Sequence, residues 1–97
     1  MTFPNPIAQA LLDKLAQLSG VLRAEYSDLN DLEAASLPGE SGHRVTCYMT
    51  EEPLGYRGSM ILPDAVINNP EQHQVLIDRM AGLLVAFSPT RRLANGA

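Results

Sequence analysis

The stretch that decides the fold is HRVTCYMT, residues 43–50, because its apolar side chains recur at every second position. Val45, Cys47 and Met49 share one face and polar side chains share the other, a period of two that is typical of a strand with one buried face. Residues 56–62, YRGSMIL, alternate in a similar way after a turn-bearing connection. The two stretches together predict a β-hairpin.

A two-stranded hairpin on its own is only marginally stable in water. The predicted hairpin therefore has three ways to become stable. It can pack on the helices, pair with a further strand from residues 64–67, or extend across a homodimer.

The first helix is expected to begin where Asn5 caps the chain and Pro6 takes the first helical position. The apolar residues that follow recur at steps of three and four, which places them on one helix face. They are Ile7, Leu11, Leu15, Leu18 and Leu22, widened by Ala8, Leu12 and Val21. Gly20 could equally end a helix, but the apolar stripe predicts that this one continues through Gly20 to about Tyr26.

A second, shorter helix is expected to follow, with Ser27 as its cap. Leu29 and Leu32 supply its apolar face, and the helix should fade near Ser36. The next six residues, LPGESG at 37–42, predict a loop because they combine proline, serine and two glycines.

The last helix repeats the device of the first, with Asn69 as the cap and Pro70 at the first helical position. Its apolar stripe comprises Leu76, Met80, Leu83 and Phe87, broadened by Ile77 and Leu84. Ser88 and Pro89 should end it. The order of helix, short helix, hairpin and helix predicts an α+β fold, with the helices packed on one face of an antiparallel sheet.

Length and composition fit one small globular domain. The 97 residues are 45% hydrophobic and 19% charged, which disfavours disorder. We expect a single domain over residues 1–97, ordered from about 4 to 88 with a flexible tail over 89–97.

The net charge of −4 argues against nucleic-acid binding. A single cysteine, no signal-peptide pattern and no long apolar run predict a cytoplasmic protein.

Residues that could carry chemistry are few and unfavourably spaced. Cys47 alternates with apolar residues, so a structural role is expected for it. His43 lies about 13 Å away along the same strand, too far to serve as a base for that thiol. His43, His73 and Cys47 show no metal-ligand spacing. We therefore assign no catalytic residue, no metal site and no cofactor.

Two surfaces are expected to bind a partner. One is acidic, because Asp28, Asp31 and Glu33 follow one another without an intervening base. The other is apolar, because the last helix is apolar nearly all round and a small domain has little interior in which to bury it. The apolar candidates are Met80, Leu83, Leu84 and Phe87.

These features favour a non-enzymatic interaction module of bacterial or phage type that binds and occludes another protein. An anti-activator, an antitoxin, an immunity protein or a specialised chaperone would act in this way. The partner could have a basic surface, and a homodimer is expected.

Two alternatives remain open. The first is a ligand-binding or enzymatic domain with its site at a homodimer interface, built from His43, Tyr48, Tyr56, Arg57 or His73. The second is nucleic-acid binding through Arg44, Arg57, Arg91 and Arg92.

Overall fold

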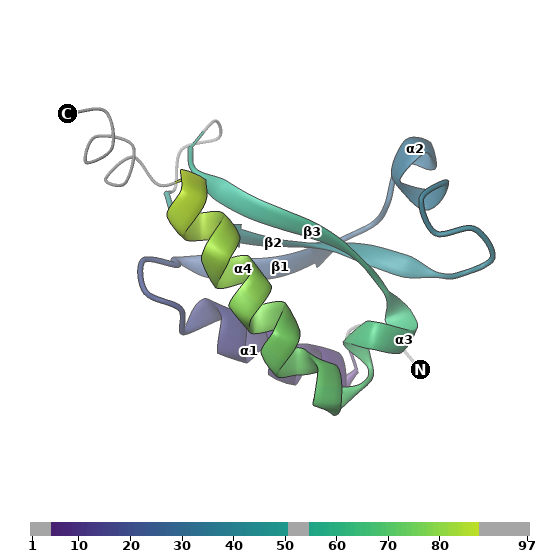
Figure 1. The fold of residues 1–97 in the computed structure, drawn as a ribbon, viewed down its shortest axis with the longest axis horizontal. Coiled ribbons are helices and arrows are strands. Elements are labelled where there is room, and N and C mark those ends of the chain that lie inside the picture. Colours follow the sequence, from purple (N-terminus) through teal and green to yellow (C-terminus); the bar gives the residue numbers. More distant parts are fainter. Residues whose placement is uncertain (1–4, 51–54, 88–97) are drawn as a thin grey trace.

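Three consecutive strands form an antiparallel sheet in the order β1-β2-β3, and helices cover one of its faces (Figure 1). The structure, a computed structural model, describes residues 5–50 and 55–87. This arrangement confirms the predicted α+β class. The strands and long helices are β1 (Arg23–Ser27), β2 (Gly42–Tyr48), β3 (Arg57–Pro63), α1 (Pro6–Ala16) and α4 (His73–Phe87). The short helices are α2 (Asp31–Ala34), α3 (Asp64–Ile67) and the 3-10 turn η1 (Pro70–Gln72).

The predicted hairpin is confirmed, and its third strand comes from an unexpected place. β2 pairs with β3 so that Val45 lies opposite Met60, as alternation of apolar side chains requires. The other edge of β2 pairs with β1, where Tyr26 lies opposite Val45. A further strand at residues 64–67 was one of the options for stabilising the hairpin. That segment instead forms the helix α3.

The predicted continuation of the first helix to about Tyr26 is wrong. α1 ends at Ala16, and Gly20 adopts a φ of +85°, a left-handed conformation that glycine adopts without strain. A β-carbon on Gly20 would lie 2.8 Å from the Met49 methyl carbon, so the chain turns tightly against the end of β2 here. The turn releases residues 23–27 from the helical pattern, and pairing with β2 makes them a strand.

Ser27 does not cap the second helix as predicted, because it is the last residue of β1. The cap is Asn30, whose side chain accepts a hydrogen bond from the Glu33 amide at 2.8 Å. The Glu33 carboxylate in turn accepts from the Asn30 amide at 3.0 Å, which completes a capping box. The predicted apolar face does not form either, because Leu32 is 84% exposed and α2 has no buried residue.

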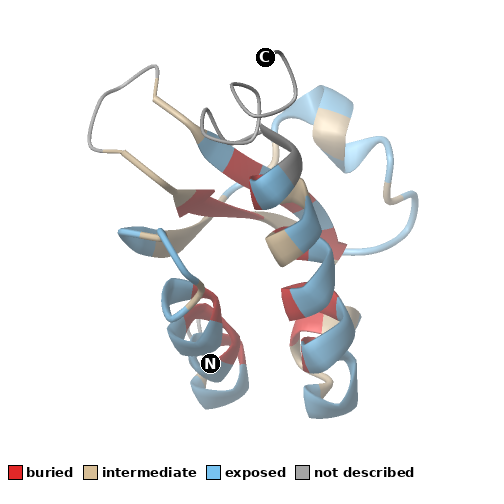
Figure 2. Cartoon of the chain, turned by 60° about the vertical axis from the view of Figure 1, so that its left-hand side comes forward, coloured by how far each residue is buried: buried red, intermediate tan, exposed pale blue. Residues whose placement is uncertain are grey.

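The core lies between the covered face of the sheet and the two long helices. Figure 2 shows the buried segments of α1, α4 and the strands facing one another across this layer. α1 packs on β1 and α4 packs on β3. The core side chains are Ala8, Leu11, Leu12, Leu15, Val45, Cys47, Met60, Leu62, Ile67, Leu76, Ile77, Met80 and Leu84. Burial of Cys47 beside Val45 confirms the predicted apolar face of β2.

The predicted roles of Asn69 as the cap and of Pro70 as the first helical residue are confirmed at the start of the last helix. The Asn69 side chain accepts a hydrogen bond from the Glu71 amide at 3.1 Å, and Pro70 opens the turn η1 that leads into α4. α4 then packs very closely on β3 at Gly58. A β-carbon there would lie 2.9 Å from Leu84 Cδ2 and 3.0 Å from Met80 Sδ. The predicted stop at Ser88 and Pro89 and the predicted tail lie outside the described residues.

Candidate functional site

An apolar hollow opens where the loop after α1 faces the C-terminal half of α4. Its volume is about 320 Å³. The lining residues are Leu18, Ser19, Met49, Ala81, Leu84 and Val85. The hollow exists because α1 ends at Ala16, so a loop rather than a helix lies beside α4 at this end of the sheet.

Apolar side chains around this hollow are open to solvent. Val85 lines the hollow and is 52% exposed. Leu22 is 54% exposed, and its amide donates a hydrogen bond to the Tyr48 carbonyl at 2.8 Å, which places it beside the strand end that carries Met49. Exposed apolar side chains that adjoin a concavity are a common feature of binding surfaces.

The residues predicted to bind a partner on α4 fall into different environments. Met80 is fully buried and Leu84 is 6% exposed, so both side chains already belong to the core. Leu83 is partly buried against that core. The Phe87 side chain lies outside the description. The exposed apolar residue at the hollow is Val85, which lies off the predicted stripe.

The predicted acidic surface lies at the opposite end of β2 from the apolar hollow. Asp28 precedes α2 and Asp31 is its first residue, and both are exposed. In Figure 1 this short helix stands apart from α1 and α4. Glu33 is already paired within the chain, because both its carboxylate oxygens accept hydrogen bonds from Arg44 Nη1, at 2.6 and 2.8 Å. Donation by the Asn30 amide and by Arg44 lowers the pKa of Glu33.

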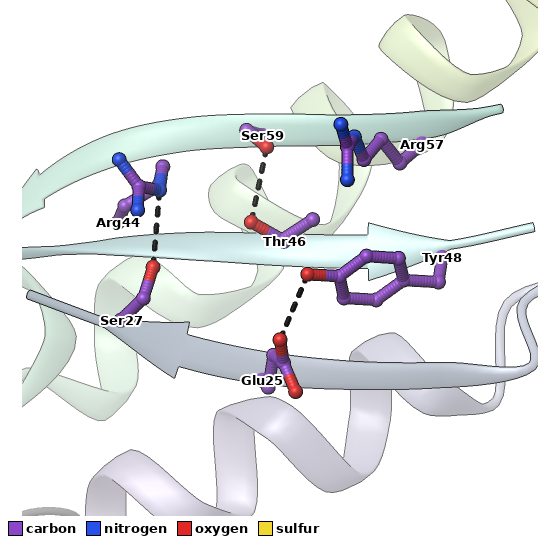
Figure 3. Close-up of a pocket in the computed structure, with 7 residues that line it drawn as sticks. All are labelled: Glu25, Ser27, Arg44, Thr46, Tyr48, Arg57 and Ser59. Carbon is purple, nitrogen blue, oxygen red and sulfur yellow. Dashed lines mark hydrogen bonds between the residues drawn. The ribbon is translucent and has the colours of Figure 1, made fainter. Parts of the chain in front are cut away.

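A second, polar hollow of about 450 Å³ lies on the open face of the sheet (Figure 3). All three strands contribute to it because alternate residues of each strand point away from the helices. Its lining residues are Glu25, Ser27, Arg44, Thr46, Tyr48, Arg57 and Ser59. The side chain of Thr46 forms part of the floor and the residue is only 5% exposed.

Hydrogen bonds between strands organise the polar hollow. The Thr46 and Ser59 hydroxyl oxygens are 3.0 Å apart, so one donates to the other. The Tyr48 hydroxyl donates to Glu25 Oε1 at 2.8 Å. Figure 3 shows these pairs side by side, with Arg44 and Arg57 on the two sides of the Thr46–Ser59 bond. The positions of these side chains are therefore fixed largely by one another.

Of the five residues expected at a ligand site, the structure brings two together. Tyr48 and Arg57 both line the polar hollow. His73 is 2% exposed, and its Nε2 is 2.7 Å from the Ile67 carbonyl oxygen, so it is held in the core. His43 lies elsewhere, with Nδ1 2.7 Å from an Asp64 carboxylate oxygen. Tyr56 precedes β3, where its carbonyl accepts from the Met49 amide at 2.9 Å.

Two of the four arginines expected to bind nucleic acid line the same hollow. Arg44 and Arg57 lie on the same open face. Arg91 and Arg92 lie outside the described residues.

The Cys47 thiol is fully buried, and burial raises its pKa to about 11. A reactive thiolate is therefore disfavoured at neutral pH. Within residues 5–50 and 55–87, no group of three or more His, Cys, Asp or Glu side chains is arranged to hold a metal ion.

Comparison of the chain with protein-family models, with curated proteins and with solved structures finds no match. Among the helices that the structure describes, none has the length and apolar character needed to cross a membrane.

Proposed function

We propose that this chain is a protein-interaction module, and that it holds its partner by apolar side chains inserted into the apolar hollow. The observation that supports this proposal is the half-exposed Val85 on the wall of a concavity whose floor is already apolar. Nothing within the described residues covers this wall. The proposed partner is another protein that presents aliphatic or aromatic anchors.

The size and chemistry of the apolar hollow suit such anchors. A volume of about 320 Å³ is at the small end of the range for ligand sites, roughly 300 to 1,000 Å³. Burial of one large apolar side chain contributes about 1.5–3 kcal/mol. Most of the binding energy of a protein interface comes from a few buried anchors of this kind.

The exposed acids would act on the rate of association instead of on the contact itself. Asp28 and Asp31 are exposed to solvent and lie at the far end of β2 from the hollow. Long-range attraction between such charges and a basic partner speeds the encounter and weakens as salt is added. The proposal that uses both the apolar hollow and the exposed acids is that the chain binds and occludes a basic protein.

The decisive experiment compares two valines of one helix. Val85 and Val75 are 52% and 51% exposed, but only Val85 lines the hollow. Val85→Asp should therefore abolish capture of the partner by the immobilised chain, because a carboxylate would have to be buried without a counter-charge. Val75→Asp is the matched control and should capture the same protein as the unchanged chain. Circular dichroism should show that both variants are folded.

Two outcomes would contradict the proposal. Equal capture by both variants would mean that the apolar hollow is not the contact. The other outcome concerns the predicted homodimer. If light scattering shows a dimer that Val85→Asp converts to a monomer, the hollow is occupied by a second copy of the chain instead of a foreign protein.

A further inference from the structure

Positive charge gathers on the open face of the sheet although the chain as a whole is acidic. The net charge is −4, yet three of the six arginines, Arg23, Arg44 and Arg57, lie on this face. The acids paired with them are Glu25 and Glu33. These five side chains together carry one excess positive charge, which makes the open face locally attractive to an anion.

Two of the three arginines are already occupied. Arg23 Nη1 lies 2.7 Å from Glu25 Oε2, and Arg44 Nη1 lies 2.6 Å from Glu33 Oε1. Within residues 5–50 and 55–87, Arg57 makes no ion pair and no side-chain hydrogen bond. Its guanidinium carbon lies 5.9 Å from the centroid of the Tyr48 ring. The excess positive charge is therefore located at Arg57.

A hydroxyl pair with one hydrogen to donate, Thr46 and Ser59, lies between Arg57 and Arg44 (Figure 3). In the Thr46–Ser59 pair one hydroxyl donates to the other, so the acceptor retains a free hydrogen. Ser27 accepts from Arg44 Nε at 3.0 Å and lies at the Arg44 end of the hollow, away from Arg57. Glu25 does not oppose an anion strongly, because Arg23 and the Tyr48 hydroxyl each bind one of its oxygens.

We propose that the polar hollow binds the phosphate group of a small phosphomonoester, with Arg57 as the principal ligand and the free hydroxyl hydrogen of the Thr46–Ser59 pair as an additional donor. A phosphate presents several strong acceptor oxygens in a tetrahedral arrangement, which donors from different directions satisfy. A carboxylate presents two coplanar oxygens, which one guanidinium satisfies without the hydroxyls. This site is separate from the apolar hollow and does not depend on the proposed protein partner.

The test is a titration of the full chain with inorganic phosphate at low ionic strength, followed by the backbone amide signals of residues 44–48 and 57–61. Arg57→Gln should weaken binding roughly tenfold to a hundredfold, as expected for loss of a hydrogen bond to a charged group. Arg79→Gln is the matched control, because Arg79 is an exposed arginine of α4 outside the hollow. It should change the dissociation constant less than about twofold.

A second variant keeps the proposal testable if Arg57→Gln alters the fold. Thr46→Val together with Ser59→Ala removes the hydroxyl pair and its free hydrogen, and should weaken phosphate binding by roughly twofold to tenfold. Succinate serves as the carboxylate probe and should bind more weakly than phosphate. Equal loss in the Arg57 and Arg79 variants, tighter binding of succinate, or signals that do not saturate with phosphate would each overturn the proposal.

Discussion

The apolar hollow and the polar hollow lie on opposite faces of one sheet, and neighbouring residues contribute to them. Tyr48 lines the polar hollow, and the next residue, Met49, lines the apolar one. Alternation that continues from the end of β2 to the residue after it thus separates two chemically different surfaces by a single position. The apolar hollow on the covered face lies where α1 stops short, whereas the polar hollow on the open face is formed by side chains that bind one another.

This difference has a mechanical consequence. The polar hollow rests on three paired strands and on hydrogen bonds between their side chains. The apolar hollow is bordered by a loop and by one wall of a helix that is buried on its other side. Substitutions on the covered face should therefore affect stability strongly, and substitutions on the open face should affect it weakly.

The largest effect is expected at Leu84, which reaches both the core and the apolar hollow. Leu84→Asp should lower the free energy of unfolding by about 3–5 kcal/mol, because it buries a carboxylate without a partner. Denaturation in urea measures the change. Val85→Asp, one residue further along α4, should stay within about 0.5 kcal/mol of the unchanged chain. A Leu84→Asp chain as stable as the original would place that residue outside the core.

Two glycines on the covered side should respond with opposite signs. Gly58→Ala should destabilise the fold by about 1–3 kcal/mol, since its β-carbon would press on Leu84 and Met80 and move α4 off β3. Gly82→Ala meets nothing within 4 Å and should stabilise α4 by roughly 0.5–1 kcal/mol. Melting curves of the two variants test the pair. A neutral Gly58→Ala would show that the helix and the strand can separate without cost.

Adjacent positions of β2 offer the next test. Cys47→Ser should cost of order 1–3 kcal/mol, because the new hydroxyl is buried on the apolar face with no arranged partner. Binding by the folded fraction should be unchanged. Thr46→Ser, on the opposite face, retains the hydroxyl that bonds Ser59 and should cost no more than about 1 kcal/mol. A larger loss at Thr46 than at Cys47 would reverse the proposed contrast.

Cys47 also predicts a dependence on alkaline pH. Burial raises its pKa to about 11, above the ordinary value of 9.0 that applies when the chain is unfolded. The unfolded chain therefore releases this proton first, and the free energy of unfolding should fall as pH rises from about 9 to about 11. Cys47→Ala should remove this part of the pH profile. Rapid labelling of the native thiol at neutral pH would contradict the burial.

The smallest effect is expected at Glu33, beside the open face. Its pKa is lowered, first by the Asn30 amide and then by Arg44, so the stability it contributes is present above its ordinary value of 4.5. That contribution should be lost as the pH falls below 4.5. Glu33→Gln should therefore make the acid branch of the stability profile shallower.

The hairpin and the starts of the first and last helices could be predicted because local chemistry determines them. Val45 and Cys47 alternate with polar residues, which fixes the buried face of β2. Asn5 and Asn69 accept hydrogen bonds from nearby amides, and each is followed by proline. These features need only neighbours in the sequence.

Sequence periodicity alone could not show that residues 23–27 form the strand β1 instead of a continuation of the first helix. Leu18 and Leu22 continue the helical spacing of α1, while Ala24 and Tyr26 also fit a strand. The choice depends on Gly20, whose turn lies against Met49 on a distant segment. Contacts of that kind are tertiary and override local preference.

The candidate site was predicted least well, for two physical reasons. The polar hollow joins three strands. The sequence indicates Tyr48 and Arg57 as candidates, but its helical spacing assigns Glu25 to a helix, so it does not place them beside Glu25. At the apolar hollow, the difference between a buried and an exposed side chain is one position along α4. Leu84 is buried, and the next residue, Val85, is exposed.

The strand order has a consequence for how the two surfaces come into existence during folding. Because β1, β2 and β3 are neighbours in sequence and in the sheet, every lining residue of the polar hollow comes from positions 25–59. The apolar hollow needs residues 18 and 85 together, so it forms only when the two ends of the domain dock. Contacts between distant segments carry a higher loop-closure cost and form later. Brief opening of α4 should thus erase the apolar hollow while the polar one persists, and amide exchange would be faster along α4 than along β2.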